Sequence, residues 1–121
     1  MPSAGSGPAA ELARVADSDG PAARAAKTAL GGGPVATRLR AAILALVRHR
    51  GPTSSICPSD AARAIGGNSW RELTAQSRTI AFALARDGDL QLTQRGNVID
   101  PDRPLRGPIR IRAKSADRSG A

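Results

Sequence analysis

Aromatic residues are nearly missing from this chain of 121 residues, which contains one tryptophan, one phenylalanine and no tyrosine. Proteins that bind single-stranded nucleic acid stack its bases on exposed aromatic rings, so this composition argues against an RNA-binding sheet or an oligonucleotide-binding barrel. The single cysteine, Cys57, excludes an intramolecular disulfide, and with the single histidine, His49, it supplies too few ligands for a zinc site. We expect no metal and no other cofactor.

Long apolar runs and catalytic constellations are also lacking. No stretch approaches the ~20 residues that a transmembrane helix needs, and the N-terminus has no apolar core of a secretory signal. A lone thiol is typical of a reducing compartment, so the sequence predicts a soluble cytoplasmic protein. Pairing Cys57 with His49 in catalysis would also require an orienting group and an oxyanion site, which no motif indicates. We interpret Cys57 as structural and expect a protein that is not an enzyme.

Positive charge is what the chain has in excess, with a formal net charge of +8. Residues 1–33 are neutral overall, whereas residues 34–112 contain thirteen arginines and six acidic residues. A basic folded domain favours an anionic partner, and nucleic acid is the first candidate. Arginine together with abundant alanine and glycine is also typical of GC-rich coding, so charge alone does not identify the partner.

The two ends of the chain differ from its middle in composition. Residues 1–33 consist largely of Ala, Gly, Pro and Ser, and their few large apolar side chains cannot bury enough surface to offset the loss of chain entropy. We therefore predict a disordered arm over residues 1–33, a folded domain over residues 34–112 and a disordered tail over residues 113–121.

Three helices are predicted within the folded domain. The first covers residues 37–50, where apolar residues recur at the spacing of one helical face. The second is short and ends at Ile65, and a turn containing two glycines leads into the third, over residues 69–87. In the third helix we expect Ser69 as the N-cap and Trp70 as an anchor in the core. The apolar face of the first helix is formed by Leu39, Ala42, Ile43, Leu46 and Val47.

The hydrophobic period then changes from helical to alternating. Residues 90–93 and 98–99 flank a glycine turn with Arg95 at its tip, which predicts a β-hairpin, and residues 109–112 predict a further extended segment. The order of helix, short strand, helix, turn, helix and hairpin predicts an α+β fold. We interpret it as a winged helix-turn-helix with three helices and a small antiparallel β-hairpin wing.

Four stretches of this domain also carry a resemblance to a known family. They are Ile56–Gly67 (ICPSDAARAIGG), Trp70–Leu73 (WREL), Leu92–Gly96 (LTQRG) and Arg106–Arg112 (RGPIRIR). Together they make the chain from about residue 36 to residue 112 similar to a bacterial domain-of-unknown-function family, family 3253. The resemblance implies a small winged-helix-like domain, and it carries over no catalytic residue.

The predicted helix over residues 69–87 has apolar side chains on one face and arginines around the other, so we interpret it as a recognition helix. The hypothesis is a non-enzymatic domain that binds duplex DNA, because arginine can bind guanine edges or phosphates and threonine and glutamine can meet either. The candidate contacts are Arg71, Thr74, Gln76, Arg78 and Arg95, the last in the wing.

Two alternatives remain open. The arginines form an ordinary solvated face, or the winged helix is a protein-protein interaction module with no nucleic-acid ligand. Phe82 bears on the choice because it lies on the basic side of the helical wheel. We favour packing of Phe82 beneath a neighbouring element, whereas an exposed ring in an apolar patch would favour a protein partner.

Overall fold

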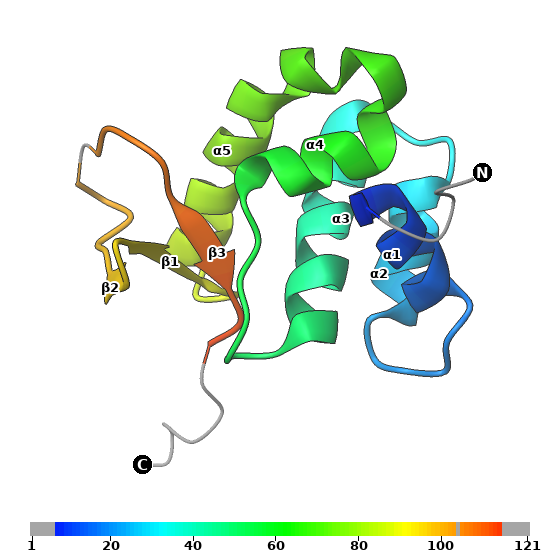
Figure 1. The fold of residues 1–121 in the computed structure, drawn as a ribbon, viewed down its shortest axis with the longest axis horizontal. Coiled ribbons are helices and arrows are strands. Elements are labelled where there is room, and N and C mark those ends of the chain that lie inside the picture. The colour runs from blue at the N-terminus through cyan, green and yellow to red at the C-terminus, as the bar shows by residue number, and fades with distance from the viewer. Residues whose placement is uncertain (1–6, 104, 115–121) are drawn as a thin grey trace.

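The computed structural model describes residues 7–103 and 105–114 (Figure 1). The helices are α1 (Gly7–Ala16), α2 (Ala23–Leu30), α3 (Val35–Arg50), α4 (Pro58–Gly66) and α5 (Trp70–Arg86), with a 3₁₀ turn, η2 (Gly67–Ser69), before α5. The strands are β1 (Gln91–Gln94), β2 (Asn97–Val98) and β3 (Arg110–Arg112). The α+β class predicted from the sequence is confirmed.

Helix α3 lies at the centre of the molecule, with α1 and α2 on one side and α5 and the sheet on the other, and α4 packs against α1, α3 and α5 (Figure 1). Every residue from Ala41 to Val47 is buried, so over nearly two turns no side of this helix faces water. The apolar face predicted for this helix is buried in the core. Ala41 and Leu44 are buried as well, on the side that faces α2.

The structure corrects the prediction of a disordered arm over residues 1–33. Helices α1 and α2 occupy most of this segment, and Leu12, Val15 and three alanines of α2 are buried in the common core; residues 1–6 lie outside the described part. Alanine side chains let helix backbones approach closely, and the second apolar side of α3 supplies the packing surface that an isolated short helix lacks.

Two arginines of α3 bind the N-terminal helices through polar contacts. Arg50 donates to both carboxylate oxygens of Glu11 on α1, at 3.0 and 2.8 Å. Arg38 donates from Nε to the carbonyl oxygen of Ala29, at 2.8 Å, near the end of α2 where carbonyl groups have no partner within the helix. Apolar packing and these side-chain contacts together hold α1 and α2 on α3.

Helix α4 begins with a capping box, and its first turn accepts a hydrogen bond from a buried hydroxyl of α5. The backbone N–H of Cys57, the N-cap, donates to the Asp60 carboxylate at 2.8 Å. On α5, the fully buried Ser77 donates from Oγ to the carbonyl oxygen of Pro58 at 2.8 Å. This bond fixes the middle of α5 against the first turn of α4.

Ser69 occupies the N-cap position of α5, as predicted, but its side chain does not cap the helix. Ser69 lies in η2, its side chain makes no capping hydrogen bond, and α5 begins at Trp70. An N-cap residue normally has an extended backbone, whereas Ser69 has φ −99° and ψ 15° because the 3₁₀ turn runs directly into the α-helix.

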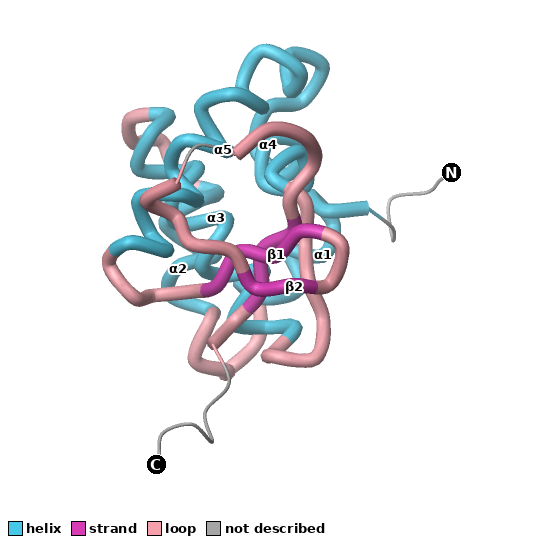
Figure 2. Tube along the Cα trace, turned by 90° about the vertical axis from the view of Figure 1, so that its left-hand side faces the viewer, coloured by secondary structure: helices cyan, strands magenta, loops and turns pink. Residues whose placement is uncertain are grey.

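The sheet has the order β2-β1-β3, and both pairs of strands are antiparallel (Figure 2). The turn Arg95–Gly96 joins β1 to β2 with positive φ at both positions, 54° and 85°, as in a two-residue type I′ turn. The predicted hairpin with an arginine at its tip is confirmed. Ile56 exchanges two backbone hydrogen bonds with Ile111, of 2.8 and 2.7 Å, on the side of β3 away from β1.

The chain between β2 and β3 is held by side chains that donate to its carbonyl oxygens. Arg78 on α5 donates to Leu105 at 3.0 Å and to Gly107 at 2.8 Å. Gln94 at the end of β1 donates through Nε2 to the carbonyl oxygens of Arg106 and Pro108, at 2.7 and 3.1 Å. The segment is therefore positioned against both α5 and the sheet, although it contains no further strand among its described residues.

Helices α3, α4 and α5 match the three helices predicted for the folded domain to within two residues at each end. The predicted number is too low because α1 and α2 precede them. Of the predicted tail, Ala113 and Lys114 follow β3, and residues 115–121 lie outside the described part. None of the helices that the structure describes is long and apolar enough to cross a membrane.

Candidate nucleic-acid interface

The start of α5 brings the one tryptophan of the chain together with two arginines. The guanidinium carbons of Arg63 on α4 and Arg71 on α5 lie over the Trp70 ring, 4.3 and 4.6 Å from its centroid. Such cation–π contacts are attractive because the ring face is electron-rich. Trp70 is half-buried and is not the core anchor predicted from the sequence, because α5 starts in an exposed turn at the edge of the core.

Both guanidiniums in this cluster are exposed and available for a ligand. Neither Arg63 nor Arg71 forms an ion pair with a residue in the described part of the chain. A guanidinium that stacks through its face keeps its N–H donors in the plane of the group, where they can bind an oxyanion in a bidentate manner. The positive end of the α5 helix dipole lies at the same place. Arg63 was not among the candidates predicted from the sequence.

Three of the predicted contact residues on α5 have different surroundings. Arg71 and Gln76 are exposed, as a surface contact requires. Thr74 is half-buried, and its hydroxyl donates to the carbonyl oxygen of Trp70 at 3.4 Å, so this group is directed back toward its own helix. Of these three side chains, Arg71 and Gln76 therefore remain accessible to a ligand.

Arg78 is engaged inside the molecule. Its two terminal nitrogens donate to the carbonyl oxygens of Leu105 and Gly107, and its guanidinium carbon lies 5.4 Å from the centre of the Phe82 ring. We therefore reassign Arg78 from a contact with nucleic acid to support of the segment between β2 and β3. Phe82 is half-buried against the core beneath this arginine, which agrees with the predicted packing.

The segment between β1 and β3 adds three exposed arginines. Arg95 occupies the hairpin tip, as predicted, and is the one residue other than glycine with positive φ among those the structure describes. Arg103 and Arg106 lie farther along and were not predicted as contacts. Their signal in the sequence is weak, because they stand between prolines and glycines without periodicity. Arg86 on α5 pairs with Asp102 of this segment at 3.3 Å.

The exposed face of α5 is electrostatically balanced. Arg71 has Glu72 beside it, Arg86 pairs with Asp102, and the exposed positions from Ala75 to Ala83 are uncharged, since Arg78 is half-buried. Further exposed positive charge lies outside this face, at Arg63 on α4 and at Arg95, Arg103 and Arg106 in the β1–β3 segment, which also contains the exposed Asp100 and Asp102.

These observations define an α+β domain with exposed arginines at the start of α5 and in the segment between β1 and β3. The model of a family described as "protein of unknown function (DUF3253)" matches residues 36–114, which include α4, α5 and all three strands. The chain belongs to this family. No curated protein matches the sequence.

Proposed function

We propose that the protein is a non-enzymatic winged-helix module that binds duplex DNA, with α5 as the recognition helix and the β1–β3 segment as the wing. The order of the elements along the chain supports this proposal: α3, Ile56, α4, α5, β1, the wing and β3. The position of β3 between Ile56 and β1 supports it as well. The short turn between α4 and α5 corresponds to the turn of a helix-turn-helix. A single thiol is in keeping with a cytoplasmic location.

The observation that carries the proposal is the cluster of Arg63 and Arg71 on Trp70. Two guanidiniums stack on the same ring at the positive end of α5 without an acidic partner among the described residues, and such an environment favours a phosphate group. Holding them on a ring also reduces the side-chain entropy that binding a phosphate would otherwise cost.

The wing contributes a second group of phosphate contacts. Arg95 adopts a left-handed backbone conformation, at φ 54°, in a position where asparagine or glycine is usual. An arginine at such a position has a conformational cost and gains no bond to a described residue, so a role in binding accounts for it better than a role in folding. Arg103 and Arg106 extend the same basic surface.

We expect weak discrimination between DNA sequences. The middle of the exposed face of α5 offers Ala75, Gln76 and Thr79, and the Thr79 hydroxyl already donates to the carbonyl oxygen of Ala75 at 3.1 Å. Gln76 is left as the side chain that can form a pair of hydrogen bonds with adenine. Affinity in this proposal comes mainly from arginine–phosphate attraction, which positions a protein without reading sequence.

The alternative of a protein-interaction module receives less support. Its main candidate, Phe82, is half-buried beneath Arg78 and packs on the core. Val98 on β2 is an exposed large apolar side chain, but a single such residue is normal on a soluble protein. No observation on these elements favours a protein partner over a polyanion.

The test is fluorescence anisotropy of a labelled duplex at low salt, titrated with the wild type and with two double variants. R63Q/R71Q removes the cluster on Trp70, and R24Q/R48Q removes two exposed arginines from the opposite part of the molecule as a control of equal charge. We expect R63Q/R71Q to weaken binding and to reduce the slope of log K against log salt by about 1.8, for two lost phosphate contacts. Absence of duplex binding, or equal losses in the two double variants, would refute the proposal.

A further inference from the structure

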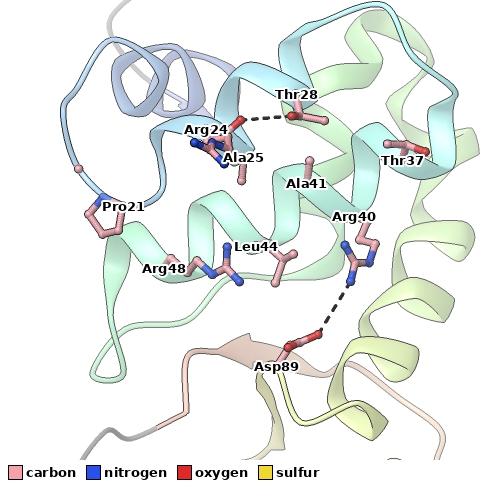
Figure 3. A pocket seen from close by; sticks show the side chains of 11 residues that line it. Pro21, Arg24, Ala25, Thr28, Thr37, Arg40, Ala41, Leu44, Arg48 and Asp89 are labelled. Carbon is pink, nitrogen blue, oxygen red and sulfur yellow. Dashed lines mark hydrogen bonds and ion pairs between the residues drawn. The ribbon is translucent and has the colours of Figure 1, made fainter.

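A cleft of about 850 Å³ lies between α2 and α3 (Figure 3), and none of the residues that line it belongs to α5 or to the strands. Its walls come from the turn after α1, from α2 and from α3, and the start of the loop after α5 closes one end. The lining residues used below are Arg24 and Ala25 of α2, Arg40, Leu44 and Arg48 of α3, and Asp89.

The rim of this cleft is basic. Arg24, Arg40 and Arg48 enter it from two helices, and Asp89 is the one acidic group in the lining (Figure 3). Arg40 and Asp89 are 3.9 Å apart and both are well exposed, so their ion pair is weak. Arg24 and Arg48 have no side-chain partner among the described residues. A concave surface lined by charge of one sign concentrates ligands of the opposite sign.

The floor of the cleft is apolar. Ala25, Ala41 and Leu44 form it, and the two small side chains leave space that larger residues would fill. Its volume lies within the range of roughly 300–1,000 Å³ that is typical of sites for small molecules. An apolar floor beneath three guanidiniums suits a molecule with an apolar body and an anionic head group better than a bare inorganic ion.

We infer that the cleft between α2 and α3 binds a small organic anion with a carboxylate or phosphate head group on an apolar body. The head group interacts with Arg24, Arg40 and Arg48, and the body covers Leu44 and the neighbouring alanines. The cleft is concave and has an apolar floor, and it contains none of the arginines proposed to contact DNA. This inference stands independently of the proposed duplex contact.

The probes for the experiment are 1-naphthoate and 1-naphthyl phosphate, with 1-naphthol and inorganic phosphate as comparisons. Titration calorimetry gives each affinity, and amide chemical shifts locate the bound probe. We expect saturable binding of at least one naphthyl anion, shifts in α2 and α3, and binding at least about ten-fold weaker for naphthol and for inorganic phosphate. Comparison of the two naphthyl anions identifies the preferred head group.

The two double variants of the duplex experiment serve here as well. R24Q/R48Q is now the test variant and R63Q/R71Q is the control. R24Q/R48Q is expected to weaken binding of the naphthyl anion at least about ten-fold, and R63Q/R71Q to leave it unchanged. A25L, which fills the floor and retains every charge, is expected to weaken it as well. Circular dichroism establishes that each variant is folded.

Three results would overturn the inference. They are the absence of saturable binding of either naphthyl anion, equal losses of naphthyl-anion binding in the two double variants, and inorganic phosphate binding as tightly as naphthyl phosphate. The third result would make the cleft a site for bare anions.

Discussion

Arg50 at the end of α3 forms a two-bond ion pair with Glu11 of α1, thirty-nine residues earlier in the chain. The same guanidinium donates through Nη1 to the carbonyl oxygen of Ser55 at 2.7 Å. Both charged side chains are mostly shielded from solvent, with 15% of the Glu11 side chain and 29% of the Arg50 side chain exposed. One residue therefore connects the N-terminal helices with the loop between α3 and α4.

Replacing Glu11 with glutamine is expected to lower the free energy of unfolding by about 1–2 kcal/mol, because it leaves a shielded guanidinium without its carboxylate. Chemical denaturation followed by circular dichroism measures the change. E72Q, which removes an exposed carboxylate from α5, is the matched control and should change stability by less than about 0.5 kcal/mol. Equal effects of the two substitutions would contradict a stabilising role for the ion pair.

The same ion pair predicts a dependence on pH. The hydrogen bond from Arg50, aided by its positive charge, lowers the pKa of Glu11 below its usual range despite the opposing effect of burial. The stability that this carboxylate contributes is therefore present above its pKa in the unfolded chain and is lost as pH falls through the lowered pKa of the folded state. The advantage of the wild type over E11Q should be constant near neutrality and disappear in acid. A constant difference throughout the acid range would argue against this linkage.

Ser77 is predicted to be more important for stability than its size suggests. S77A removes the hydrogen bond to Pro58 and leaves a buried carbonyl oxygen without that partner, which should lower the free energy of unfolding by about 1–3 kcal/mol. T79A on the same helix is the control, because the Thr79 hydroxyl bonds within its own helix and is exposed. Thermal and chemical unfolding should therefore separate the two variants clearly.

Arg78 is predicted to act as a positioning residue for the wing. R78Q should increase the rate of amide hydrogen exchange in residues 105–109, since it removes the bonds to the Leu105 and Gly107 carbonyls. R86Q is the control, because the ion pair of Arg86 with Asp102 is largely exposed. Unchanged exchange in R78Q would mean that other contacts hold this segment.

Arg95 is predicted to show opposite effects on stability and binding. Asparagine is well suited to a left-handed turn position, so R95N should raise the free energy of unfolding by up to about 1 kcal/mol. Under the proposed function the same substitution should weaken duplex binding and lower the salt slope by about 0.9. If R95N bound the duplex with the same affinity as the wild type at every salt concentration, the hairpin tip would not be part of the interface.

The elements with a regular hydrophobic period could be predicted from the sequence, and those whose packing comes from distant residues could not. Helices α3, α4 and α5 and the type I′ hairpin have local signals in side-chain period and turn residues. Helices α1 and α2 are rich in alanine and contain few large apolar side chains of their own. The sequence of α3 nevertheless indicated that further elements cover this helix. The run Ala41–Val47 is apolar on all sides, as is typical of a helix that is buried on every side.

The contacts of the candidate interface were harder to predict than its elements. The contact of Arg63 with Trp70 depends on the geometry of η2, and the bonds of Arg78 join residues that are twenty-seven and twenty-nine positions apart. A helical wheel places Arg78 on the outward side but does not include the chain that later covers it. The sequence therefore predicted the helix and the presence of its arginines, but it could not distinguish the accessible arginines from the engaged ones.

The complete burial of the middle of α3 has a consequence for the part of the chain shared with the family. The matched region begins at residue 36, after both N-terminal helices, so half of the cover of α3 comes from outside it. Cleavage in the exposed turn at residues 31–34 would leave α1 and α2 attached to α3 by noncovalent contacts alone, and their release would uncover Leu44 together with the neighbouring alanines. The shared region without these helices would therefore expose apolar surface that favours self-association.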